Sequence, residues 1–138
     1  MSNKPFILIA DDDQEDRYLL NIAFEEIGQP DDIYLVENGL QVFSYLDASV
    51  LQKDMPSLIV LDLNMPKLDG MQTLSLLKAH ALYKHIPVIM FTTSIQEVEK
   101  AKCLEMGAVD FIKKPTRFNQ TISAAKFFHD SAVGMTKH

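Results

Sequence analysis

The sequence contains no tryptophan and only one cysteine, Cys103, among its 138 residues. One thiol cannot form an internal disulfide, which excludes the small secreted domains that several disulfides hold together. A lone thiol in a helix-like segment is more typical of a packed side chain than of a nucleophile. We therefore expect Cys103 to be packed inside the protein.

Long hydrophobic runs are also absent. No apolar stretch approaches the roughly 20 residues of a membrane-spanning helix, and residues 1–5 lack the apolar core of a signal peptide. These absences predict a cytoplasmic protein without a membrane segment. The length is that of one ordinary domain, and 47% hydrophobic with 23% charged residues is the balance of a globular protein with a real core. We expect a single domain spanning residues 1–138.

Positive charge is scarce, and the formal net charge is −6. Such a surface repels nucleic acid, so we expect no direct binding to DNA or RNA. Acidic residues crowd together near the N-terminus, which is also a pattern found at cation sites. They are Asp11, Asp12, Asp13, Glu15 and Asp16.

Short apolar runs alternate with segments that carry apolar residues at helical spacing. Runs that are apolar on consecutive residues suit a parallel sheet covered by helices on both faces. The pattern therefore predicts an α/β domain with a doubly wound, five-stranded parallel sheet. The expected strands are Phe6 to Ala10, Ile33 to Val36, Leu58 to Leu61, Val88 to Phe91 and Val109 to Ile112.

The segments between these strands should bury one apolar stripe each. The fourth helix is expected to carry its stripe at Val98, Ala101 and Leu104, with Glu105 in line with it. The other expected stripes are Leu19, Leu20, Ala23, Phe24 and Ile27; Val42, Phe43, Leu46 and Val50; Leu74, Leu77 and Ala81; and Ile122, Ala125 and either Phe128 or His129.

Polar residues follow the strands at the sheet edge where open parallel sheets bind ligands. Asp11 and Asp12 follow the first strand, Asp62 the third, Thr92 the fourth and Lys114 the fifth. With the flavodoxin-like strand order 2-1-3-4-5, the first and third strands are neighbours and their aspartates converge. Carboxylates at close range repel one another unless a proton or a divalent cation neutralises them, and Mg²⁺ takes such oxygen ligands.

An aspartate after a strand is also a common helix N-cap. For Asp13 we favour capping or simple exposure. Capping does not explain why Asp12 and Asp62 occur together with Lys114, so we interpret these three as a chemical site.

Four segments of the chain resemble the receiver domains of two-component response regulators, and the resemblance covers roughly residues 6–129. Each segment is modest evidence alone, but four in the right order at the right strand ends are highly specific. They are Ile7 to Asp13; Leu61 to Pro66 with Asp69-Gly70; Phe91-Thr92-Thr93; and Phe111 to Pro115.

The resemblance implies a role for each matching residue. Asp62 would accept a phosphoryl group from a sensor histidine kinase or a phosphotransfer protein, in a reaction that needs Mg²⁺. Asp12 would bind the metal directly and Asp11 mainly through water. The backbone carbonyl of Asn64 would be a further metal ligand. Thr92 and Lys114 would bind the phosphoryl oxygens. Asn64 and Ser94 occupy positions that tune the decay of the phosphorylated state in this family. The Lys114–Pro115 peptide bond is expected to be cis, as is usual in this family.

The resemblance also implies a switch. Thr92 would move toward the phosphoryl group and allow the ring of Phe111 to turn inward, although Phe111 fits equally well as a fixed core residue. The readout would be a protein partner on the face made by the fourth helix, the fifth strand and the fifth helix. We expect a monomer or weak dimer, without an output domain, similar to the phytochrome-associated regulators.

Three other functions are compatible with parts of the pattern. A Mg²⁺-dependent phosphatase with an aspartyl nucleophile commonly needs a second acid two residues later, where this chain has Asn64. A flavin-binding module of the same topology would need a phosphate loop where this chain has three aspartates. A degenerate receiver would bind partners without phosphorylation, yet all the chemical residues are present. We therefore expect a phosphoacceptor domain and not an enzyme that turns over a separate substrate.

Overall fold

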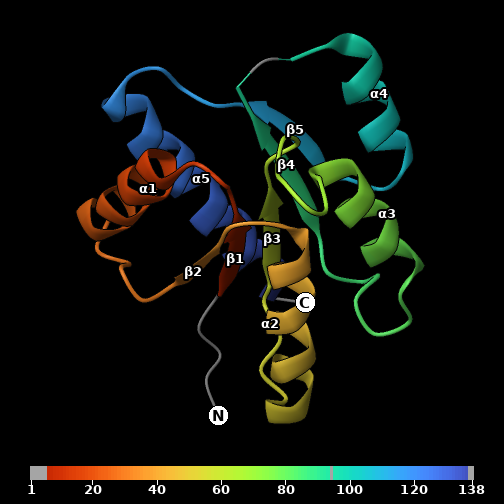
Figure 1. Ribbon diagram of the computed structural model, residues 1–138. Coiled ribbons are helices and arrows are strands. Elements are labelled where there is room, and N and C mark those ends of the chain that lie inside the picture. Colours follow the sequence, from red (N-terminus) through yellow and green to blue (C-terminus); the bar gives the residue numbers. More distant parts are fainter. Residues whose placement is uncertain (1–5, 94, 137–138) are drawn as a thin grey trace.

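The computed structural model describes residues 6–93 and 95–136, so Ser94 lies outside the described residues. Five parallel strands form one sheet in the order β2-β1-β3-β4-β5, as the sequence predicts (Figure 1). The elements in chain order are β1 (Ile7–Ala10), α1 (Gln14–Glu26), β2 (Ile33–Val36), α2 (Gly39–Gln52), β3 (Leu58–Leu61), α3 (Gly70–Ala79), β4 (Val88–Thr92), α4 (Glu97–Glu105), β5 (Asp110–Lys113) and α5 (Phe118–Thr136).

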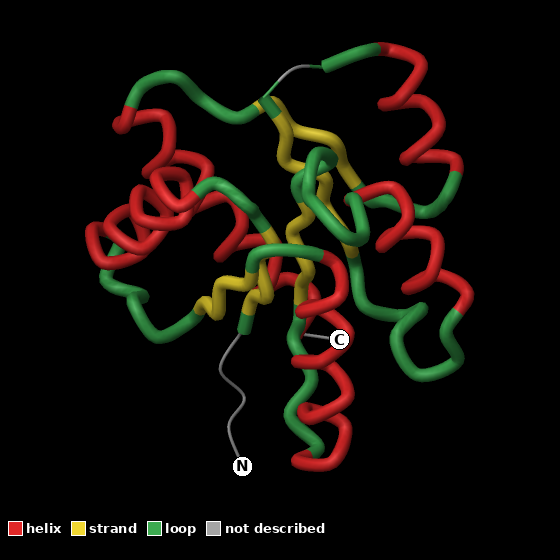
Figure 2. The backbone as a smooth tube through the Cα atoms, in the orientation of Figure 1, coloured by secondary structure: helices red, strands yellow, loops and turns green. Residues whose placement is uncertain are grey.

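Helices cover both faces of the sheet (Figure 2). Successive side chains of a strand point to opposite faces, and β1 accordingly contributes to two separate cores. Leu8 packs in a cluster with residues of α2 and α3, whereas Ile9 packs in a cluster with residues of α1 and α5. Burial on both faces explains why the central strands are apolar at every position. Within the described part of the chain, no helix is both long and apolar enough to cross a bilayer.

Side-chain caps fix where the first three helices begin. The Asp13 carboxylate accepts hydrogen bonds from the backbone N–H groups of Glu15 and Asp16, which confirms Asp13 as the N-cap of α1. Asn38 caps α2. Asp69 and Gln72 form a capping box at the start of α3.

The expected buried face of α4 is wrong. Val98 is 81% exposed, Leu104 is 40% exposed and Ala101 is exposed as well, whereas Cys103 is fully buried. Val98, Ala101 and Leu104 lie on one side of this short helix and Cys103 on another, so the apolar spacing favours the side that the structure leaves exposed. Ala81 is also exposed, because α3 ends at Ala79 and Ala81 lies in the following turn.

Burial should make Cys103 slow to react. Desolvation raises the pKa of its thiol, and the nearby Glu99 raises it further. We expect iodoacetamide to modify Cys103 at least about a hundredfold more slowly in the native protein than in denaturant, as followed by intact mass. A matched control moves the thiol to the exposed side of α4, as Ala101→Cys in a Cys103→Ala background. Equal rates for the two thiols in the native protein would contradict this.

Gly70 packs directly against the backbone that carries Asp62. A Cβ atom at Gly70 would lie 2.2 Å from the Asp62 carbonyl oxygen and 2.8 Å from Leu63 Cα. The Gly70 N–H also donates to the Leu63 carbonyl at 2.9 Å. The first turn of α3 is therefore in van der Waals contact with the end of β3, and only glycine fits there.

We expect Gly70→Ala to lower the free energy of unfolding by about 1–3 kcal/mol, because backbone atoms must move to admit the methyl group. Urea denaturation followed by circular dichroism measures this. Gly134→Ala is the matched control, since Gly134 lies in α5 with open space around it. The control should be neutral or more stable by up to about 1 kcal/mol. Equal stabilities for the two variants would show that the contact is not restrictive.

Candidate functional site

The carboxyl ends of the strands bring four side chains to one edge of the sheet. Asp11 follows β1, Asp62 follows β3, Thr92 is the last residue of β4 and Lys114 follows β5. Backbone hydrogen bonds continue beyond the strands and fix these positions. Asp62 N–H donates to the Ala10 carbonyl at 3.0 Å, and Lys114 N–H donates to the Thr92 carbonyl at 2.6 Å.

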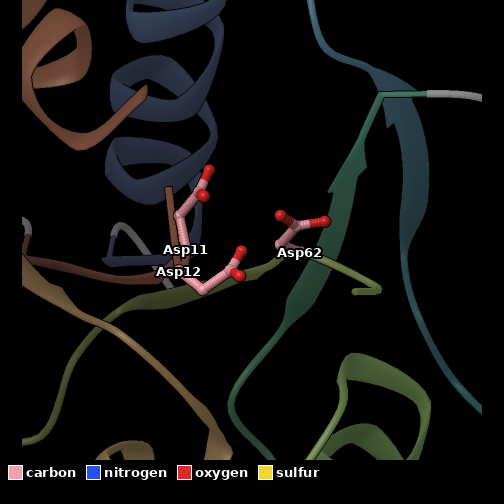
Figure 3. A group of neighbouring side chains, drawn as sticks. All are labelled: Asp11, Asp12 and Asp62. Atoms are coloured by element: carbon pink, nitrogen blue, oxygen red, sulfur yellow. The ribbon is translucent and has the colours of Figure 1, made fainter. Parts of the chain in front are cut away.

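Asp11, Asp12 and Asp62 form a cluster of carboxylates. Each offers one oxygen, and these oxygens lie within 4.8 Å of one another. Figure 3 shows the Asp12 side chain extending toward Asp62 from the segment that follows β1. Asp11 and Asp62 are buried, whereas Asp12 is exposed. The sequence predicted this convergence from the strand order.

The ammonium group of Lys114 lies among three carboxylates. Its Nζ atom is 2.7 Å from Asp11 Oδ2, 2.8 Å from Asp16 Oδ2 and 2.9 Å from Asp62 Oδ2. Burial alone lowers the pKa of Lys114, but the bonds to Asp11, Asp16 and Asp62 outweigh burial and raise that pKa. The lysine is therefore cationic at neutral pH and balances part of the acidic charge.

Burial raises the pKa of Asp11 to about 6, although Lys114 and the Asp13 N–H both act to lower it. The lysine thus compensates the cluster only in part. A divalent cation would complete the compensation, and the donor set fits Mg²⁺, because all the donors are hard carboxylate oxygens and Asp12 is open to water. Asp11, Asp12 and Asp62 are the residues that would hold it.

Asn64 lies beside this cluster. Its backbone N–H donates to Asp62 Oδ1 at 3.3 Å, so its peptide is adjacent to the expected metal position. Its side chain is exposed. The expected metal contact through the Asn64 carbonyl remains a prediction.

Thr92 is buried, and its hydroxyl makes no hydrogen bond to any described residue. Met90 and Thr92 point to the same face of the sheet, and Phe111 on β5 pairs with Met90. Thr92 and Phe111 are therefore diagonal neighbours on one face. Phe111 is only 4% exposed and packs in the core, so the inward position of its ring does not need phosphorylation.

The structure contradicts one prediction about the site and adds one contact that was not predicted. The Lys114–Pro115 peptide bond is trans, so the expected cis bond is wrong. The contact of Asp16 with Lys114 was not predicted, because Asp16 lies in α1 and not at a strand end, where the expected site residues are. A signal was nonetheless present, since Asp16 continues the buried α1 stripe of Leu20 and Ala23 at helical spacing. An acid in line with this stripe is directed toward the sheet and can reach a cation at its edge.

Comparison with known proteins agrees with this geometry. Residues 7–126 match the response regulator receiver domain family. Chemotaxis protein CheY1 of Helicobacter pylori is 28% identical over 109 residues, which cover 79% of this chain and 84% of CheY1. The two-component response regulator-like protein PRR37 of Oryza sativa subsp. indica is 32% identical over 114 residues, or 83% of this chain. The chain spans only 15% of the length of PRR37.

The fold comparison identifies the same group of proteins. The crystal structure of the phosphorylated cyanobacterial phytochrome response regulator RcpA matches with a TM-score of 0.83 and 26% sequence identity, covering 94% of both chains. This confirms the expected similarity to phytochrome-associated regulators. The strand order, the acidic cluster and the family match over most of the sequence lead to one conclusion: the chain belongs to the response regulator receiver domain family.

Proposed function

We propose that this receiver domain accepts a phosphoryl group on Asp62 in a Mg²⁺-dependent reaction and signals through protein contacts. The observation that carries the proposal is the position of the Asp62 carboxylate. It is buried at the end of β3, with Lys114 at 2.9 Å and the acidic pair Asp11 and Asp12 beside it. The donor in this proposal is a phosphohistidine of a sensor kinase or phosphotransfer protein.

The residues of the site divide the work of phosphoryl transfer. A carboxylate oxygen of Asp62 forms a bond to phosphorus while the bond from phosphorus to the histidine nitrogen breaks, and solvent protonates the released nitrogen. A carboxylate is a weak nucleophile, so the rate depends on alignment and on neutralisation of charge. Bound Mg²⁺ supplies positive charge to the phosphoryl oxygens. Lys114, which follows β5, supplies a second positive charge.

Thr92 is suited to detect the phosphoryl group. A buried hydroxyl without a partner is costly, and a phosphoryl oxygen would satisfy it. Movement of Thr92 would change the space next to Phe111, the diagonal neighbour on β5. We propose that this pair starts the structural response, although Phe111 already lies inside the core.

The proposed output surface is the face formed by α4, β5 and α5. A cavity of about 450 Å³ lies on it between β5 and α5, beside Lys113 and Phe127. Exposed large apolar side chains occur on α4 at Val98 and Leu104 and on α5 at Phe118 and Phe127. Exposed apolar groups of this kind are typical of protein contacts. We propose a downstream protein there, and a cytoplasmic location for the exchange.

The chemical proposal predicts a mass change. Incubation with acetyl phosphate and Mg²⁺ should add one phosphoryl group to the protein, and Asp62→Asn should abolish the addition, because the proposal makes the Asp62 carboxylate the acceptor and assigns Asp11 and Asp12 to the metal. Intact mass spectrometry at neutral pH measures this. EDTA should prevent the addition. Asp31→Asn should leave it intact, because Asp31 is an exposed acid that precedes β2, whereas the site residues follow their strands.

Other outcomes would replace the proposal. An unchanged mass in the unmodified protein would favour a degenerate receiver that binds its partners constitutively. Continuous hydrolysis of p-nitrophenyl phosphate, lost in Asp62→Asn, would favour the aspartyl phosphatase. Addition of a phosphoryl group that persists in Asp62→Asn would place the acceptor elsewhere.

A second prediction concerns Thr92. Replacing it by valine removes a hydroxyl that has no partner among the described residues, so the free energy of unfolding should stay unchanged or rise by about 1 kcal/mol. The variant should nonetheless gain less thermal stability from beryllofluoride, an analogue of the phosphoryl group, because one hydrogen bond to the analogue is lost. Differential scanning calorimetry measures both effects.

The neighbouring, exposed Thr93 provides the control, as Thr93→Val. It should gain as much stability from beryllofluoride as the unmodified protein. A Thr92→Val variant that is less stable than the unmodified protein without the analogue, yet responds fully to it, would assign Thr92 a structural role.

A further inference from the structure

The carboxylate of Asp16 contacts the site from outside the metal cluster. It belongs to the first turn of α1, is about one-third exposed and lies 2.8 Å from Lys114 Nζ. Two hydrogen bonds fix this turn against the end of β1. Asp16 N–H donates to Asp13 Oδ1 at 3.2 Å, and Arg17 Nη1 donates to the Asp11 carbonyl at 2.8 Å. The Asp16 carboxylate is therefore held toward the lysine by the backbone of α1.

The three carboxylates around Lys114 differ in what else they would bind. In the proposed function, Asp11 belongs to the metal cluster and Asp62 becomes the phosphorylated group. The contact between Lys114 and Asp62 must then pass to a phosphoryl oxygen. Asp16 belongs to neither set, so its bond to the ammonium can persist before and after the transfer.

We propose that Asp16 is a positioning residue that anchors Lys114 so that its ammonium faces the phosphoryl oxygens on Asp62. The inference rests on the proposed function. A lysine side chain has four rotatable bonds and loses much rotamer freedom when it is fixed. The charge-assisted bond to Asp16 fixes it in advance, so less freedom is lost when the phosphoryl group binds.

If Asp16 acted only through its negative charge, removing that charge would have the opposite effect on binding of the phosphoryl group. Asp16 is one more negative charge near an anionic ligand, and removing such a charge would strengthen anion binding. The anchoring role predicts weaker binding when Asp16 loses its charge. Glu15 separates the two effects, because it lies in the same turn of α1, is exposed and is not among the described carboxylates that pair with Lys114.

The experiment measures the affinity for beryllofluoride at saturating Mg²⁺, using the ¹⁹F NMR signal of the bound analogue on the full chain. Asp16→Asn should weaken binding about tenfold, in line with the loss of a supporting contact around a charged site. Glu15→Gln should bind as tightly as the unmodified protein or slightly better. Asp16→Glu, which retains the charge, should recover part of the loss. The affinity for Mg²⁺ alone should change equally in Asp16→Asn and Glu15→Gln.

Two results would overturn the inference in different ways. If Asp16→Asn and Glu15→Gln bind beryllofluoride equally well while the unmodified protein also binds it, Asp16 acts only as a surface charge and the proposed function stands. If the unmodified protein gives no bound signal, the proposed function fails and the inference fails with it. Circular dichroism of each variant excludes unfolding as the cause of a loss.

Discussion

The cationic side chain of Lys114 is the interaction on which the rest of the site depends. Two buried carboxylates, Asp11 and Asp62, lie next to each other at the sheet edge, and burying them without a counter-charge would be costly. The lysine offsets that cost from β5, and Asp16 joins it from α1. The ends of three strands and one helix are thereby tied together by a single ammonium group.

This interaction couples folding to chemistry. The residues that would bind a metal and a phosphoryl group are the same residues whose repulsion the lysine reduces. Thr92 adds a second unsatisfied feature, since its buried hydroxyl has no partner in the described structure. A protein optimised only for stability would have an apolar residue there. Polar and charged groups at this edge of the sheet thus lack full hydrogen-bonding and charge compensation, unlike the two apolar cores. This is expected where a bound ligand completes the structure.

Most of the architecture could be predicted because strands that are apolar at every position define a doubly covered parallel sheet. The convergence of Asp11, Asp12 and Asp62 followed from strand order, because strand ends share one edge. Features that depend on how a helix is rotated were not predictable. The α4 sequence has apolar residues on several sides, so its spacing did not identify Cys103 as the buried residue. The Asp16 contact also depends on how α1 is rotated against the sheet, and the trans bond before Pro115 has no local sequence signal.

The close contact between Gly70 and the Asp62 carbonyl limits where the chain can vary in length. The segment between these residues must span a fixed distance, because the two ends touch through backbone atoms. An insertion there would separate the acidic cluster from α3 or bulge into it. The connection between α2 and β3 at the opposite end of the sheet, residues 53–57, carries none of the residues of the cluster. Insertions, tags and fused domains are therefore best accommodated at that end, where the loops can lengthen without disturbing the chemistry.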